Sequence, residues 1–120
     1  MINLNQLRAF YFVAKYSSFT IAAKKLFISQ PAVTAQVKLF EKHHDLKLFN
    51  KHGKNLILTH PGKLLFKKAI QIFKFEDEVE NTLAQIKKTN QGKHRILSHT
   101  IKKYMMRRKP YYRFKLTQDN

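Results

Sequence analysis

The chain has 120 residues, enough for one compact domain with an extension, and 43% of them are hydrophobic, which suffices for a core. It contains 24 basic and 7 acidic residues, a net charge of +17, and no cysteine, which excludes disulfide scaffolds, zinc–thiolate sites and thiol catalysis. So large a charge opposes compact folding by self-repulsion and favours a polyanionic partner, with nucleic acid first and an anionic membrane surface second.

The positive charge is unevenly distributed along the chain. Residues 1–92 hold 15 Lys and Arg against 6 Asp and Glu, whereas residues 93–120 hold 9 against 1. The N-terminal segment MINLNQLRAF lacks the features of a signal peptide, and no stretch approaches the roughly 18 uncharged residues of a membrane span. We therefore expect a cytoplasmic protein with no membrane span, in which the basic C-terminal region needs its own interpretation.

The first part of the chain predicts three helices. The first, of about four turns, has apolar residues at helical spacing and ends at Tyr16-Ser17-Ser18. Thr20 is placed to cap a short second helix, and Ser29 to cap a third, which runs to about His43 with Pro31 in its first turn. The third helix turns inward three side chains: Val33, Val37 and Phe40. The tight turn between the second and third helices predicts a helix-turn-helix.

A β-hairpin and a long helix are predicted next. The apolar runs 46–49 and 56–58 flank a basic turn at 50–55, in which Gly53 permits the reversal of the backbone. Thr59 is placed to cap a helix with no breaker from Lys63 to about Asn90. Apolar residues recur along it at steps of four and three, with Glu76 at the one polar position: Leu65, Ala69, Ile72, Val79, Leu83 and Ile86. This stripe predicts a coiled-coil seam between two copies, and the alternative is a helix packed on its own domain.

The order of these elements, with FTIAAKKLFISQPAVTAQVKLFE, LKLFNKHGKNLILT and the glycine of HPGKLL, closely resembles the DNA-binding domain of LysR-type transcriptional regulators. The resemblance covers about residues 2–92. It implies a mainly α fold: a winged helix-turn-helix of three helices and a two-stranded β-wing, then a long linker helix that pairs two subunits. We accordingly expect a DNA-binding domain at 1–59, a dimerisation helix at 60–92, and a basic, poorly ordered tail at 93–120.

Family members continue into an effector-binding domain that senses a small molecule. Residues 92–97, GKHRIL, begin like the strand that opens that domain, and the sequence then departs from the family. Our hypothesis is a gene interrupted near codon 94, leaving a truncated regulator with an out-of-frame tail. We expect no small-molecule effector for this form.

The third helix is expected to enter the major groove, since short polar side chains let its backbone approach base edges. Helical geometry places Thr34 and Lys38 outward with Gln36 at the margin, and the resemblance implies that Gln30, Pro31 and Thr34 face DNA. Ser29 is either a plain cap or a phosphate contact, and solvent exposure is the alternative for Gln30 and Thr34. The remaining expected contacts are to phosphate: Thr20 at a helix N-terminus, and Lys51, His52 and Lys54 in the wing.

The sequence favours no enzyme, metal or cofactor. The six histidines lack ligand-like companions, and the acidic cluster at 76–80 reads as a solvated helix face. We therefore predict a sequence-specific double-stranded DNA-binding regulator of transcription that acts as a homodimer. The alternatives are a non-regulating remnant of such a gene, and a small basic RNA- or ribosome-associated protein driven by residues 93–120, where basic residues are interleaved with aromatic ones.

Overall fold

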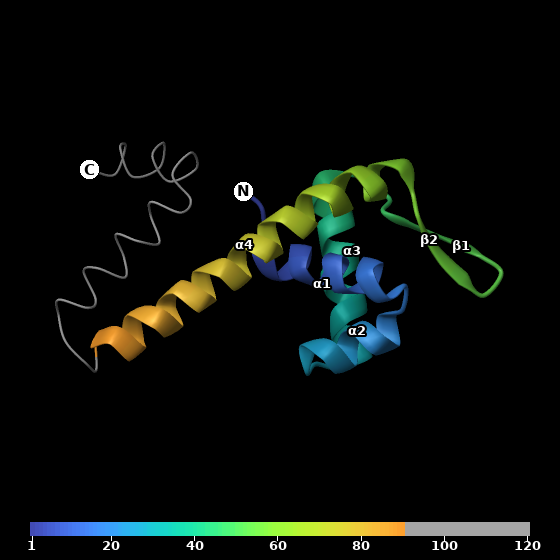
Figure 1. Ribbon diagram of the computed structural model, residues 1–120. Helices are drawn as coiled ribbons and strands as arrows, with labels where there is room; N and C mark the ends of the chain where they lie inside the picture. The colour runs from blue at the N-terminus through green and yellow to red at the C-terminus, as the bar shows by residue number, and fades with distance from the viewer. Residues whose placement is uncertain (91–120) are drawn as a thin grey trace. The chain divides into compact units, whose positions relative to one another are not determined.

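The computed structural model describes residues 1–90, which form four helices and one β-hairpin (Figure 1). In chain order these are α1 (Leu4–Tyr16), α2 (Phe19–Leu26), α3 (Gln30–His44), β1 (Phe49–His52), β2 (Asn55–Leu58) and α4 (His60–Asn90). The fold is mainly helical, with three helices and a two-stranded wing before a long helix, as predicted. The predicted tail at 93–120 lies outside the described residues.

Two compact units make up the structure, and each is described by itself. The first unit comprises Met1–Phe75, and the second begins at Glu76 and is described as far as Asn90. The first unit extends into α4, where the Phe73 ring packs on Tyr11 of α1. The division into a DNA-binding domain at 1–59 and a dimerisation helix at 60–92 stays a prediction.

Side-chain caps begin α2 and α3. Ser29 caps α3 as predicted, since its Oγ accepts a hydrogen bond from the Ala32 N–H at 3.2 Å, and Pro31 lies in the first turn. The prediction that Thr20 caps α2 is wrong. Ser18 is the cap: its backbone is extended, and its Oγ accepts from the Ile21 N–H at 3.0 Å. The helix therefore begins at Phe19, and Thr20 lies within its first turn.

The C-terminal caps of α2 and α3 are residues in the left-handed conformation. Phe27 ends α2 with φ 58°, and Asp45 ends α3 with φ 52°. Glycine is the residue that takes this conformation without steric cost. Phe27 and Asp45 therefore end their helices in a conformation that suits glycine better.

The wing is paired differently from the sequence prediction. Antiparallel pairing from Phe49↔Leu58 to His52↔Asn55 leaves Gly53-Lys54 as a two-residue turn, with Gly53 at φ +62°. The predicted strand at 46–49 and turn at 50–55 are therefore wrong in their limits. A turn with glycine at its first central position matches the right-handed twist of a hairpin, so polar residues 50–52 pair although they lack an apolar pattern.

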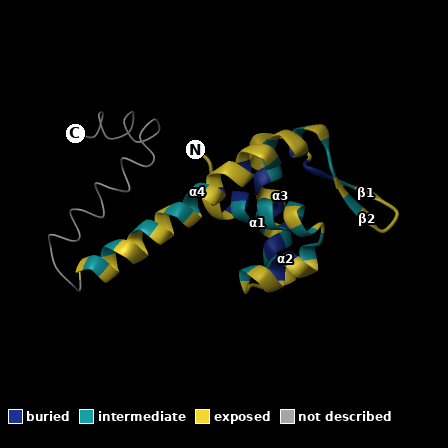
Figure 2. Cartoon of the chain, viewed as in Figure 1, coloured by how far each residue is buried: buried dark blue, intermediate teal, exposed yellow. Residues whose placement is uncertain are grey.

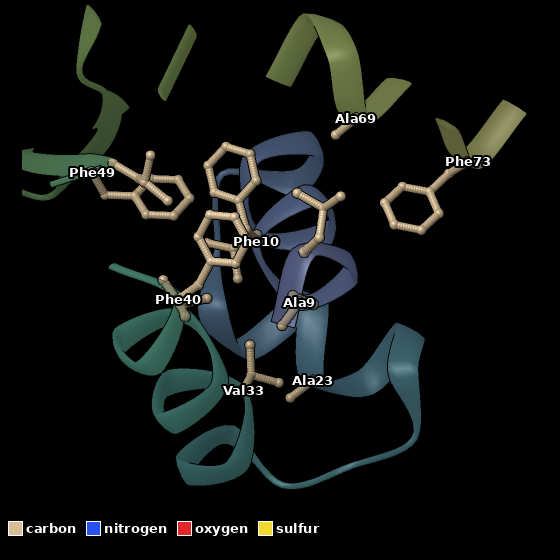
Figure 3. Close-up of a cluster of buried hydrophobic side chains, with 13 residues drawn as sticks. Ala9, Phe10, Ala23, Val33, Phe40, Phe49, Ala69 and Phe73 are labelled. Carbon is tan, nitrogen blue, oxygen red and sulfur yellow. The ribbon is translucent and has the colours of Figure 1, made fainter. Parts of the chain in front are cut away.

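The core of the first unit gathers side chains from α1, α2, α3, β1 and α4 (Figure 3). Phe10 is fully buried in it, with its ring centroid 5.4 Å from that of Phe49. All three side chains predicted to point inward from α3 are buried: Val33, Val37 and Phe40. These contacts fix α3 against α1 and leave its opposite face exposed (Figure 2).

α4 begins close to the backbone that precedes the wing. Thr59 caps it as predicted, since the Gly62 N–H donates to Thr59 Oγ1 at 3.1 Å, while that hydroxyl donates to the Lys47 carbonyl at 2.6 Å. Further along, the Tyr11 ring lies 5.0 Å from that of Phe73. Within residues 76–90, where the second unit is described, every residue is exposed or half-buried. None of the helices described combines the length and apolar character that a membrane crossing needs.

Candidate nucleic-acid interface

The exposed face of α3 is slightly hollowed near its N-terminus. The hollow is shallow and open to solvent, with a volume of about 530 Å³, and its lining residues follow one helical stripe: Gln30, Pro31, Thr34, Ala35 and Lys38. Four of these five are sequence-predicted contacts, which the fold brings together on one face. Ala35 was missed, although its position four residues after Pro31 would have indicated the same face.

The other two predicted residues of this region lie apart from the hollow. Gln36 is half-buried and does not line it, which agrees with a place at the margin of the face. Ser29 is exposed, but its hydroxyl accepts from the Ala32 N–H as the cap of α3. The interpretation of Ser29 as a helix cap is therefore confirmed, and a contact with phosphate stays a prediction.

A hydrogen bond joins the two helices of the helix-turn-helix at this face. The Thr20 hydroxyl, on the first turn of α2, donates to Gln30 Oε1 at 2.9 Å. Both residues are exposed. Thr20 therefore lies beside the first residue of α3, next to the hollow that Gln30 lines.

The first unit has a strongly positive net charge. Its sequence holds 13 Lys and Arg against two acidic residues, Glu41 and Asp45, and residues 1–40 contain no acidic side chain. The Glu41 carboxylate turns toward the fold, where Oε2 accepts from the Leu48 N–H at 2.7 Å. The face of α3 that carries the hollow thus presents Lys38 with no carboxylate lining it, a suitable environment for an anion.

The tip of the wing is a second basic surface. The three predicted residues, Lys51, His52 and Lys54, are exposed around the two-residue turn. The base of the hairpin is anchored, because Leu48 is fully buried and the Phe49 ring packs 5.8 Å from that of Phe19. Figure 1 shows the hairpin extending beyond helices α1–α3. The strand pairing places Lys51, His52 and Lys54 in or next to its turn.

The predicted seam of α4 divides into buried and exposed residues. Ala69 has no exposed surface, and Leu65 is half-buried and packs against the core, so both stabilise their own unit. Both residues fit the packing alternative, and a role of Leu65 in dimerisation stays a prediction. Three others expose 40–58% of their side chains, namely Ile72, Val79 and Leu83, and Ile86 is half-buried.

No three His, Cys, Asp or Glu side chains within residues 1–90 are grouped so as to hold a metal ion.

Comparisons with known proteins agree with this geometry. The family model described as "Bacterial regulatory helix-turn-helix protein, lysR family" matches residues 4–63. The RuBisCO operon transcriptional regulator of Allochromatium vinosum is 39% identical over 95 residues, which cover 79% of this chain and 32% of that protein. The regulator CitR of Bacillus subtilis is 36% identical over 86 residues, covering 72% and 28%. The chain thus spans about a third of the length of these relatives.

Among solved structures, the BenM_DBD/catB site 1 DNA complex superposes with a TM-score of 0.63 at 28% identity. The match covers 78% of this chain and 100% of the BenM chain. One assignment follows from the fold, the hollowed face of α3 and the match to residues 4–63. This chain belongs to the lysR family of bacterial regulatory helix-turn-helix proteins.

Proposed function

We propose that the chain binds double-stranded DNA at specific sequences and regulates transcription. The observation that carries this proposal is the hollowed face of α3, on which four short or polar side chains and one lysine gather within an acid-free part of the sequence. A helix that reads base edges must approach the major groove closely, which small and uncharged side chains allow and acidic side chains oppose by repelling phosphate. The proposal also assigns the protein to the cytoplasm, where bacterial DNA lies.

In the proposed complex, the face of α3 reads bases and the wing holds the DNA backbone. Hydrogen-bonding groups for base edges come from Gln30, Thr34 and Lys38. The compact side chains of Pro31 and Ala35 allow the helix to lie close to the DNA. Lys51 and Lys54 contribute charge contacts to phosphate that strengthen binding to any sequence. Affinity therefore comes largely from the basic residues, and sequence preference from the N-terminal half of α3.

The proposal includes a homodimer formed through the second half of α4. Val79, Leu83 and Ile86 follow a spacing of four and three, and no residue from 76 to 90 is buried in the described structure. Helices gain most of their stability from packing of an apolar face, so burial of this stripe against a second copy would stabilise the second half of α4. Pairing of two copies would present two α3 helices to a partly palindromic site, with half-sites about one helical turn apart.

The test of DNA recognition is selection of bound duplexes from a random library. The full chain and a variant ending at residue 92 are compared side by side. We expect both to enrich the same motif with two half-sites, whereas enrichment of no motif by either would contradict the proposal and favour a non-regulating remnant. If the shortened variant loses nearly all affinity and neither form prefers a sequence, residues 93–120 drive binding, as in an RNA- or ribosome-associated protein.

The dimer has a separate test. Leu83→Glu places a charge in the apolar stripe, and Asn81→Glu places the same charge on an exposed residue two positions away. We expect sedimentation equilibrium to show a dimer for the wild type and for N81E, and a monomer for L83E. Equal masses for all three proteins would contradict dimerisation through this part of α4.

A further inference from the structure

We propose that Thr20 is a positioning residue, which orients the Gln30 amide and thereby sets the base preference of α3. This inference rests on the proposed function, because it concerns how the recognition face reads DNA. It differs from the sequence-based expectation that Thr20 contacts phosphate at the N-terminus of α2.

A hydrogen bond crosses the helix-turn-helix from α2 to α3. Thr20 Oγ1 donates to Gln30 Oε1 at 2.9 Å, and the two residues are ten positions apart in the sequence. Their backbones are held by the core beneath, because Ala23 on α2 and Val33 on α3 are both buried in one cluster (Figure 3). The two helices therefore hold donor and acceptor at bonding distance without movement of either backbone.

The Thr20 hydroxyl has only one hydrogen to donate. The phosphodiester oxygens of DNA are acceptors. A Thr20 hydroxyl that donates to Gln30 therefore has no hydrogen for a phosphate. While Thr20 donates to Gln30 Oε1, as it does in the structure, it cannot also donate to a phosphate.

The hydrogen bond from Thr20 fixes the orientation of the Gln30 side-chain amide. The amide torsion of a free glutamine is broad and roughly two-fold, so an unrestrained side chain presents either its oxygen or its NH₂ group outward. With Oε1 accepting from Thr20, the two Nε2 hydrogens are left for a partner beside the hollow. An NH₂ group donates to N7 of purines, O6 of guanine or O4 of thymine in the major groove. Thr20 thus fixes which edge of Gln30 the DNA meets.

The test compares base preference in the full chain and in three single variants. The selected operator is varied to all four base pairs at each position, and the dissociation constants are measured for the wild type, Thr20→Val, Thr20→Ser and Gln30→Ala. Valine keeps the shape of threonine but has no hydroxyl, whereas serine keeps the hydroxyl. Thermal unfolding of each variant establishes that it is folded before binding is measured.

We expect T20V to reduce discrimination about fivefold or more at one base pair of each half-site and to leave the other positions unchanged. T20S should retain the wild-type preference. In the double variant T20V/Q30A, the valine should add nothing to the effect of Q30A, because Thr20 acts through Gln30.

The opposite results overturn the inference. A phosphate contact predicts that T20V weakens binding to every sequence by one factor, and that this factor is the same with and without Q30A. An unaltered preference in T20V overturns the positioning role alone. A wild-type chain that prefers no sequence overturns the proposed function as well, so the two failures are distinguishable.

Discussion

Replacing Gly62 by alanine tests how α4 joins the rest of the first unit. Gly62 lies in the first turn of α4, where an added Cβ would collide with the backbone carbonyl oxygen of Leu48 and would lie 3.1 Å from Leu58 Cδ2. The oxygen cannot move aside freely, because Leu48 is fully buried and its carbonyl accepts from the Thr59 N–H at 3.0 Å. A side chain at this position therefore requires the backbone of one segment to shift.

Two opposing effects decide the outcome of Gly62→Ala. Alanine is favoured over glycine by about 1 kcal/mol in a helix interior, which sets an upper limit to the gain in the first turn of α4. Against this, overpacking a tight contact costs about 1–3 kcal/mol, and loss of the bond between Thr59 and Leu48 costs about 1 kcal/mol more. We expect a net loss of about 1–3 kcal/mol in the free energy of unfolding, which lowers Tm by roughly 5–20 °C in a unit of this size.

Thermal unfolding followed by circular dichroism measures the effect, at one protein concentration for all variants because association raises apparent stability. Lys63→Ala is the matched control, since Lys63 is exposed in the same turn and its replacement introduces the same residue without a collision. We expect K63A to unfold within a few degrees of the wild type. A Tm for G62A at or above the wild-type value would refute the reasoning, because helix propensity would then outweigh the contact with Leu48.

Three further variants follow from the same structure. Phe27→Asn should raise the free energy of unfolding, measured by chemical denaturation, by up to about 1 kcal/mol. The reason is that Phe27 is 93% exposed and its left-handed backbone conformation suits asparagine. A lower free energy of unfolding would contradict this. Thr59→Val should cost about 1–2 kcal/mol through loss of the cap of α4 and of the bond to Lys47, whereas Thr59→Ser should unfold near the wild-type temperature. Lys51→Ala should weaken DNA binding equally for all sequences and reduce the slope of log Kd against log salt by about one; a loss confined to one base pair would indicate base readout.

Much of the first unit could be predicted from the sequence because local signals agreed there. Ser29 followed by Pro31 predicts the start of α3, and the structure has the cap and the proline in those places. Thr59 likewise predicts the start of α4. The inward residues of α3 follow from the helical period alone, which also fixes the opposite, exposed face. The grouping of Gln30, Thr34 and Lys38 was therefore predictable once the helix was located.

Other features depend on geometry that the sequence leaves ambiguous. Ser18 and Thr20 are both good caps, and the choice between them depends on which residue has the extended backbone that lets its hydroxyl reach an N–H three residues on. The strand limits depend on a two-residue turn at Gly53, which pairs polar residues that no hydrophobic pattern marks. The bond between Thr20 and Gln30 joins residues of two helices, so it appears only when the turn between them is built.

The apolar stripe of α4 illustrates why periodicity predicts a helix face better than it predicts the partner of that face. Leu65, Ala69 and Val79 belong to one regular pattern, yet Ala69 is fully buried by the first unit and Val79 is 40% exposed. The buried members of the pattern lie in the part of α4 that packs on α1, where Tyr11 and Arg8 contact the Phe73 ring. Before this point, the apolar residues of the stripe pack in the core of the first unit. Beyond it the same pattern leaves apolar surface that favours association, which is why the dimer proposal concerns Val79, Leu83 and Ile86 and not the whole stripe.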